Sequence, residues 1–153
     1  MQCTRANLTA EKGAADAAQA QAGAAADGFP TGTVIYLDVE AVSSVSQALE
    51  SYVRAWAEAL LEGGRYTPGL YAHARNAERL YAIMADAFAR AGRTQRPRLW
   101  VATSQGFDLG RIPLESGFAT AYIWQGLFDT PETYGGITLR IDANVADSAN
   151  PSR

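Results

Sequence analysis

The sequence has few of the features that would fix a fold or a function by themselves. Cys3 is the only cysteine among 153 residues, so the chain can form no internal disulfide and no thiolate metal cluster. Thirteen Lys and Arg residues against sixteen Asp and Glu give a net charge of −3. This balance lacks the basic surface typical of nucleic-acid-binding proteins, and we expect no nucleic-acid partner.

Long apolar runs are also missing. No stretch of 18 apolar residues occurs, so we expect no membrane-spanning helix. The first residues lack the charged start and apolar core of a signal peptide, and we expect nothing in this chain to direct export. The apolar share of 48% and the charged share of 19% are instead typical of a globular protein, and the length suits one domain.

The most informative segment is the apolar run 34–40, which ends in two carboxylates. It reads as a buried strand, in which alternate side chains share one face. Asp38 and Glu40 therefore point the same way, with Tyr36 behind them, and two strand rises separate them by about 7 Å. Two acids held this close are costly unless they bind, pair or react, which indicates a functional site.

Helical and strand patterns alternate along the chain. The spacing of apolar residues and caps predicts a helix from Thr9 towards residue 27, a second from residues 43–46 to 63, and a third capped by Asn76 and closed by Gly92. Ser44 and Gln47 stand at capping-box spacing for the second. Apolar, β-branched and aromatic residues predict strands over residues 34–40, 70–72, 98–103, 118–125 and 137–144.

This order predicts an α/β fold with about five parallel strands. Five strands are too few for a closed eight-stranded barrel, so the chain is either an open sheet or the C-terminal portion of such a barrel. Either arrangement leaves sheet edges unpaired, which favours self-association.

Polar residues recur at the carboxyl ends of the predicted strands, where parallel α/β folds carry their active sites. Asp38, Glu40 and Asp142 would therefore converge on one opening. The aromatic and amide side chains expected beside them are Tyr71, Trp100, Tyr122, Trp124 and Gln125. Carboxylates with aromatic rings favour a carbohydrate site over the alternative, an Mg²⁺ or Ca²⁺ site, and we expect no metal or other cofactor.

Simpler roles exist for several of these residues. Asp142 could pair with Arg140, and the two tryptophans could pack in the core, as helical spacing indicates for Trp56 and Phe88. His73, the only histidine, reads as a loop residue.

The order of these motifs resembles a known family. The strand ending in Asp38 and Glu40 is followed by Thr-Pro-Gly-Leu-Tyr (67–71), Leu-Trp-Val-Ala (99–102), Tyr-Ile-Trp-Gln (122–125) and Ile-Asp-Ala-Asn (141–144). This series is similar to glycoside hydrolase family twenty-five lysozymes. It is closer to the related glycoside hydrolase-like domain of actinobacterial secreted proteins.

The resemblance implies the C-terminal portion of a (β/α)8 barrel that lacks the first three strands and the Asp that the first strand carries. It implies Glu40 as the general acid, Asp38 as its partner and Asp142 as the acid of the last strand, with aromatic substrate contacts beside them. Residues 9–147 would form the domain, residues 1–8 a disordered or remnant start and residues 148–153 a tail. A secreted or cell-wall location follows from the same resemblance.

Three functional hypotheses remain open. The chain is a lysozyme-like hydrolase of a peptidoglycan-type polysaccharide, a glycan-binding module without turnover, or a gene fragment with no independent function. In the hydrolase hypothesis Glu40, kept protonated by acidic neighbours and partial burial, donates a proton to the leaving oxygen.

Overall fold

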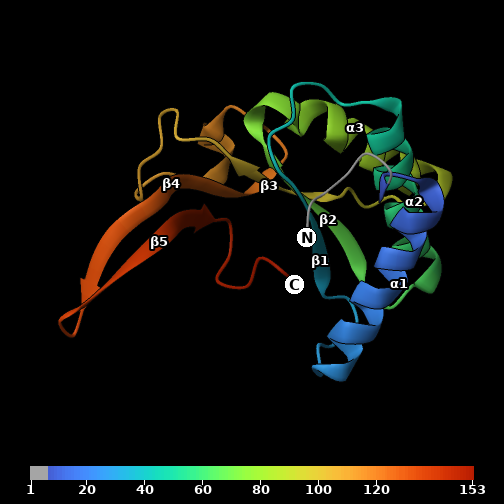
Figure 1. Cartoon of the computed structure of the whole chain (residues 1–153), viewed down its shortest axis with the longest axis horizontal. Coiled ribbons are helices and arrows are strands. Elements are labelled where there is room, and N and C mark those ends of the chain that lie inside the picture. The colour runs from blue at the N-terminus through green and yellow to red at the C-terminus, as the bar shows by residue number, and fades with distance from the viewer. Residues whose placement is uncertain (1–6) are drawn as a thin grey trace.

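The computed structural model describes residues 7–153 and shows an α/β fold whose sheet curls into a half-barrel (Figure 1). The helices cover the convex side of the curl, and the concave side stays open (Figure 1). The elements in chain order are α1 (Ala10–Ala26), β1 (Val34–Val39), α2 (Gln47–Gly63), β2 (Thr67–His73), α3 (Ala74–Arg90), β3 (Arg98–Ala102), the short 3-10 helix η2 (Pro113–Ser116), β4 (Ala121–Tyr134) and β5 (Ile137–Ala146).

The five strands lie in sheet order β1-β2-β3-β4-β5. The first four are parallel, as predicted, but β5 runs antiparallel to β4, so the prediction of five parallel strands is wrong for the last. The cause is the length of β4, which continues to Tyr134 where the sequence predicted a connection. Only Gly135 and Gly136 then separate β4 from β5, with φ of 57° and 82°. A two-residue link with positive φ makes a hairpin and cannot carry the crossover that a parallel strand needs.

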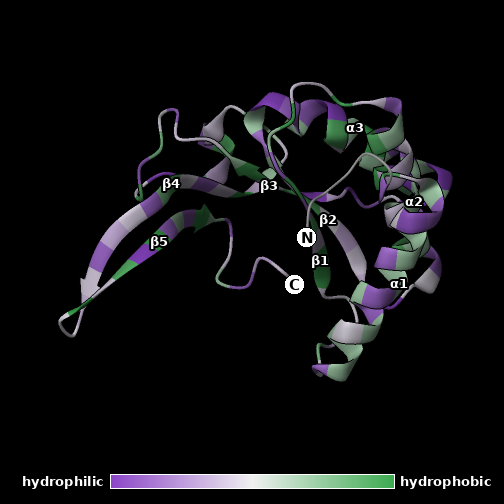
Figure 2. Ribbon diagram, viewed as in Figure 1, coloured by the Kyte–Doolittle hydropathy of each residue, from purple (hydrophilic) through white to green (hydrophobic). Residues whose placement is uncertain are grey.

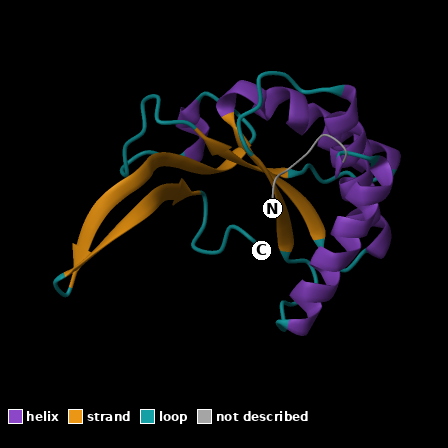
Figure 3. Ribbon diagram, in the orientation of Figure 1, coloured by secondary structure: helices purple, strands orange, loops and turns teal. Residues whose placement is uncertain are grey.

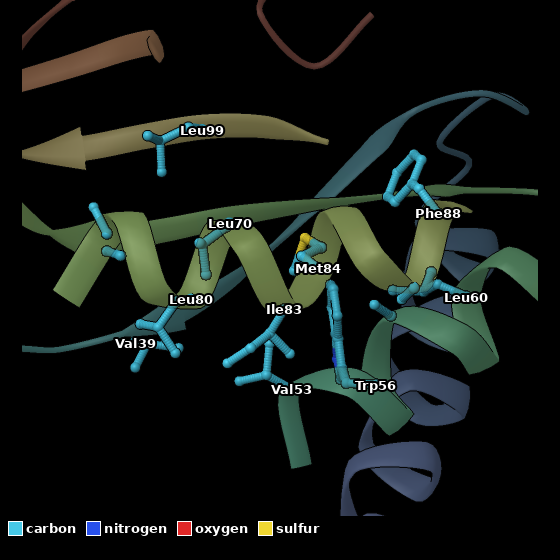
Figure 4. Packing of buried hydrophobic residues seen from close by; sticks show 14 of the residues in the cluster. Val39, Val53, Trp56, Leu60, Leu70, Leu80, Ile83, Met84, Phe88 and Leu99 are labelled. Atoms are coloured by element: carbon cyan, nitrogen blue, oxygen red, sulfur yellow. The ribbon is translucent and has the colours of Figure 1, made fainter. Parts of the chain in front are cut away.

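The core lies between the convex face of the sheet and the helices. Figure 4 shows Leu70 and Leu99 of the sheet near Leu80 and Met84 of α3. Trp56 and Phe88 belong to the same cluster, which confirms their predicted packing role. Polar and apolar residues alternate along α2 and α3, as expected for helices with one buried face (Figure 2).

The N-terminal ends of the helices show both a success and a failure of local prediction. Thr9 is the N-cap of α1, and its Oγ1 accepts from the amide of Lys12 at 3.1 Å, as predicted. The N-cap of α2 is Ser46, so the predicted capping box at Ser44 is wrong.

The N-cap of α3 is His73, which ends β2, and not Asn76. Asn76 is buried inside the helix instead, and its Oδ1 accepts from the Val42 amide at 3.0 Å. This bond holds the loop that follows Glu40 against α3. The predicted cap therefore has a different structural role, close to the candidate site.

Two glycines of α1 provide a test of how closely α1 and α2 pack. A Cβ on Gly13 would lie 2.4 Å from the carbonyl oxygen of Tyr52, whereas a Cβ on Gly23 would meet nothing within 4 Å. We expect Gly13→Ala to lower the free energy of unfolding by about 1–3 kcal/mol, because the helices must move apart. Gly23→Ala should raise it by up to about 1 kcal/mol through helix propensity. Urea unfolding followed by circular dichroism measures both, and equal effects would contradict the close contact.

The C-terminal segment after β5 returns across the open side towards β1 (Figure 3). The carbonyl oxygen of Ser152 accepts from the amide of Val34 at 2.8 Å. The carbonyl oxygen of Pro151 accepts from Tyr36 Oη at 3.0 Å and from Arg98 Nη1 at 2.6 Å. The tail predicted for residues 148–153 thus bridges the two ends of the curled sheet.

Two further predictions stay as predictions. The first is the disordered or remnant start, because most of the segment 1–8 lies outside the described residues. The second is self-association through exposed sheet edges, which a single chain does not test. Within residues 7–153, no helix has both the length and the apolar character needed to cross a membrane.

Candidate functional site

A pocket of about 450 Å³ lies at the carboxyl ends of the parallel strands. Its lining is polar for the most part: Glu40, Tyr71, His73, Ala102, Thr103, Ser104, Gln125, Phe128 and Asp142. These residues come from five segments that are far apart in the sequence. Carboxyl ends of parallel strands are where α/β folds place their binding sites.

Strand register explains why these side chains face the open side. Asp38, Tyr71 and Trp100 are direct partners across β1, β2 and β3, so their side chains share one face of the sheet. The neighbouring Leu70 and Val101 are fully buried in the core on the other face. The face with the carboxylates is therefore the one that the helices leave uncovered.

The three predicted acids gather around one phenol. Burial raises the pKa of Tyr71, and the carboxylates of Glu40, Asp38 and Asp142 raise it further. Glu40 and Asp142 line the pocket, and Asp38 lies beside Tyr71 in the sheet. Glu40 and Asp142 thus line one pocket, whereas Asp38 is not part of its lining. Glu40 is exposed, so the partial burial expected for it is wrong.

Asp142 is the most firmly held of the three. One of its oxygens accepts from Gln125 Nε2 and the other from the amide of Asp129, both at 2.8 Å. Arg140 pairs with Asp129, so the alternative pairing of Arg140 with Asp142 is wrong. Since both oxygens of Asp142 act as acceptors, this side chain is arranged to present a fixed negative charge to the pocket.

The aromatic residues divide into two groups. Trp100 packs edge-on against Tyr71 and Tyr36, with ring centroids 5.3 Å and 5.7 Å apart, and its Nε1 donates to Asn144 Oδ1 at 2.9 Å. These three rings lie on the open face. Trp124 is fully buried, so it does not line the pocket that the sequence assigned it to.

Tyr122 also lies away from the acids. Its ring stacks on the guanidinium of Arg98 at 4.5 Å and lines a separate cavity of about 690 Å³ at the other end of the strands. The substrate contact predicted for Tyr122 is therefore wrong for the acidic pocket.

Five pocket residues were not among the predicted site residues: His73, Thr103, Ser104, Ala102 and Phe128. The first three had a signal, because they follow directly at strand ends. His73 also caps α3, with its Nδ1 accepting from the Arg75 amide at 3.1 Å. Phe128 had none, because residues 126–136 were assigned to a connection.

The arrangement of the acidic side chains can be compared with that of metal ligands. Across residues 7–153 there is no group of three or more His, Cys, Asp or Glu side chains placed to hold a metal ion. The alternative of an Mg²⁺ or Ca²⁺ site finds no support in this geometry.

Asp38 gives the site a measurable pH signature. Burial raises its pKa above the ordinary 3.8. The folded protein thus holds this proton more tightly than the unfolded chain, a stabilising effect that is complete below about pH 4 and lost as the pH rises through the raised pKa. At neutral pH the ionised Asp38 therefore costs stability.

We expect Asp38→Asn to raise the melting temperature at neutral pH, because the ionised carboxylate is removed. The rise should be only about 1–2 °C, because Asp38 is exposed to solvent. The gain should vanish below about pH 4. Asp86→Asn is the contrasting control, because the hydrogen bond from Arg54 lowers the pKa of Asp86. Replacing this carboxylate should therefore lower the melting temperature at neutral pH. Thermal melts across pH measure both, and a lower melting temperature for Asp38→Asn at neutral pH would contradict the assignment.

The fold and this pocket define a class, an α/β domain with an acidic site at the carboxyl ends of its strands. Residues 2–146 match the model of the Rv2525c-like, glycoside hydrolase-like domain, and the chain belongs to this family. The resemblance seen in the sequence is thereby confirmed at the level of the glycoside hydrolase-like domain.

The fold is similar to that in a 1.07 Å crystal structure of an uncharacterized B. stearothermophilus protein. The TM-score is 0.64 at 21% identity, and the match covers 90% of this chain and 63% of the other. At this identity the likeness concerns the fold alone. This chain thus spans less than two thirds of the length of that protein. No curated protein matches the chain.

Proposed function

We propose that this domain binds a polysaccharide in the acidic pocket and hydrolyses a glycosidic bond there. The observation that carries the proposal is that Glu40 from the end of β1 and Asp142 from β5 line one pocket with Tyr71. Glycoside hydrolases use a pair of carboxyl groups on either side of the bond that they cleave. Membership in a glycoside hydrolase-like family supports the same chemistry.

The surroundings of each acid suggest its role. Glu40 is exposed in the pocket and is free to approach a leaving oxygen, so it is the proposed general acid. Asp142, held by Gln125 and the Asp129 amide, supplies a fixed charge for an oxocarbenium-like transition state. Asp38, whose pKa is raised by burial, lies on the same face of β1 two residues before Glu40 and places a second carboxyl group beside it.

The proposed substrate is a β-linked amino-sugar polymer of the peptidoglycan type. Support comes from the resemblance to family twenty-five lysozymes and from the half-barrel curl of the sheet, whose first four strands are parallel (Figure 1). Action on such a polymer fits a secreted or cell-wall location, which is proposed with it. Tyr71 and Trp100 provide aromatic surface on the face where a sugar would lie.

A second candidate function is glycan binding without turnover. The observation that favours it is the open half-barrel, which leaves the concave side of the sheet uncovered by helices (Figure 3). Hydrolases benefit from a site that excludes water around the reacting groups, whereas binding alone does not require enclosure.

One sample of purified protein tests these functions. Insoluble peptidoglycan is incubated with the protein, bound protein is measured in the pellet, and released reducing ends are measured in the supernatant. Hydrolysis predicts both signals, and glycan binding alone predicts only the first. Neither signal from a protein that melts cooperatively would overturn the proposed function. A chain that shows no cooperative melt would support the fragment hypothesis instead.

A further inference from the structure

The β4–β5 hairpin extends well beyond the helices as an arm of the sheet (Figure 1). Its two faces differ in character. On β5, residues with odd numbers (137, 139, 141, 143 and 145) are all apolar, and Val145 packs against the core. Residues with even numbers include Thr138, Arg140, Asp142 and Asn144. Alternation along a strand places these four side chains on one face.

The polar face of the arm is continuous with the pocket. Asp142 lines the pocket, and Asn144 accepts from Trp100 on the open face of the sheet. Towards the tip, Arg140 pairs with Asp129, and the hydroxyls of Thr133 and Thr138 lie 3.0 Å apart. Thr138 is four positions before Asp142 in the sequence, which corresponds to about 14 Å of strand.

These groups are suited to sugar hydroxyls. Thr133, Thr138 and Arg140 are exposed, and together they offer hydroxyl and guanidinium groups in a row. The pocket itself is of a size that takes a small ligand. A longer chain bound in the pocket would continue along this row.

We propose that the polar face of the hairpin is an extended binding surface, so that the ligand of this domain is a long glycan chain and not a short free sugar. The inference rests on the proposed function and specifies the length of its ligand. The additional hydrogen bonds along this row would make longer chains bind about tenfold more tightly.

The test compares the affinity of the full chain for a dimer and a hexamer of N-acetylglucosamine by calorimetry. The wild-type ratio of hexamer to dimer affinity should be about ten, and Thr133→Val with Thr138→Val should reduce it about fivefold or more. Valine keeps the shape and strand preference of threonine and has a methyl group in place of the hydroxyl. Thr130→Val is the matched control, because Thr130 pairs with Ile141 on the apolar face. It should leave the ratio unchanged.

Different failures have different meanings. Equal affinities for dimer and hexamer in the wild type, or a ratio unchanged in the double variant, would overturn the inference and leave the proposed function standing. An equal loss of the ratio in Thr130→Val would also overturn it, because the effect would then not belong to the polar face. Absence of binding at both lengths, together with no binding to insoluble peptidoglycan, would overturn the proposed function and the inference with it.

Discussion

Glu40→Gln is expected to lower the rate of reducing-end release by about 10²–10⁴-fold, the range that a general acid contributes. Glutamine keeps the shape of the side chain and can still hydrogen-bond, but it cannot donate the proton that the leaving oxygen requires. Glu40 is exposed at the end of β1, so the substitution removes no buried contact. The melting temperature should therefore change little while turnover is lost.

The matched control is Glu132→Gln, which makes the same chemical change on the apolar face of the hairpin, opposite Leu139. It should retain the wild-type rate. Asp142→Asn should lower the rate as well, and it should also lower stability, because an amide nitrogen would face either Gln125 Nε2 or the Asp129 amide in place of an acceptor. A Glu40→Gln protein with the wild-type rate would show that another group supplies the proton.

Local patterns in the sequence sufficed for half of the candidate site. Asp38 and Glu40 lie on one strand, and strand alternation alone places their side chains on one face. The face itself follows from the apolar residue between them, because Val39 must point into the core. Such predictions need no knowledge of how distant segments pack.

Asp142 was predicted to reach the same opening for a reason that the structure contradicts. A parallel fifth strand would have placed it near the carboxyl end of the sheet, but β5 is antiparallel. Asp142 reaches the pocket because β4 continues past Gln125 and bulges on either side of Leu127, which brings the Asp129 amide onto the carboxylate. Periodicity predicts a strand without its direction, and short turn signals such as Gly135-Gly136 carry the missing information.

The side of the sheet on which the Trp124 side chain lies could not be predicted from the sequence either. In the segment around it, Ile123, Trp124 and Gln125 are all buried, so no alternation of polar and apolar residues reveals which side faces the core. A shift of one residue in register exchanges the two faces of a strand. The irregular register between β3 and β4 at Leu99 and Trp100 decides the outcome here, and it depends on tertiary packing.

Trp124→Ala should therefore destabilise the fold rather than weaken glycan binding directly. The indole is fully buried, packs edge-on against Phe107 with centroids 5.1 Å apart, and donates from Nε1 to the carbonyl oxygen of Thr103 at 2.7 Å. Removing a buried tryptophan costs about 3–5 kcal/mol, which corresponds to a fall of about 6–20 °C in melting temperature. Trp124→Phe keeps most of the volume and leaves the Thr103 carbonyl oxygen without its donor, so a loss of about 1–3 kcal/mol is expected.

Trp100→Ala distinguishes a core role from a site role, because Trp100 is only half-buried and lies on the open face beside Tyr71. It should cost less stability than Trp124→Ala, about 1–2 kcal/mol, and should reduce binding of insoluble peptidoglycan at temperatures where the protein is fully folded. Trp124→Phe, measured under the same conditions, should bind as the wild type does. The reverse pattern, with stability lost at Trp100 and binding lost at Trp124, would mean that the two tryptophans exchange roles and that the sugar-facing surface lies on the other side of the sheet.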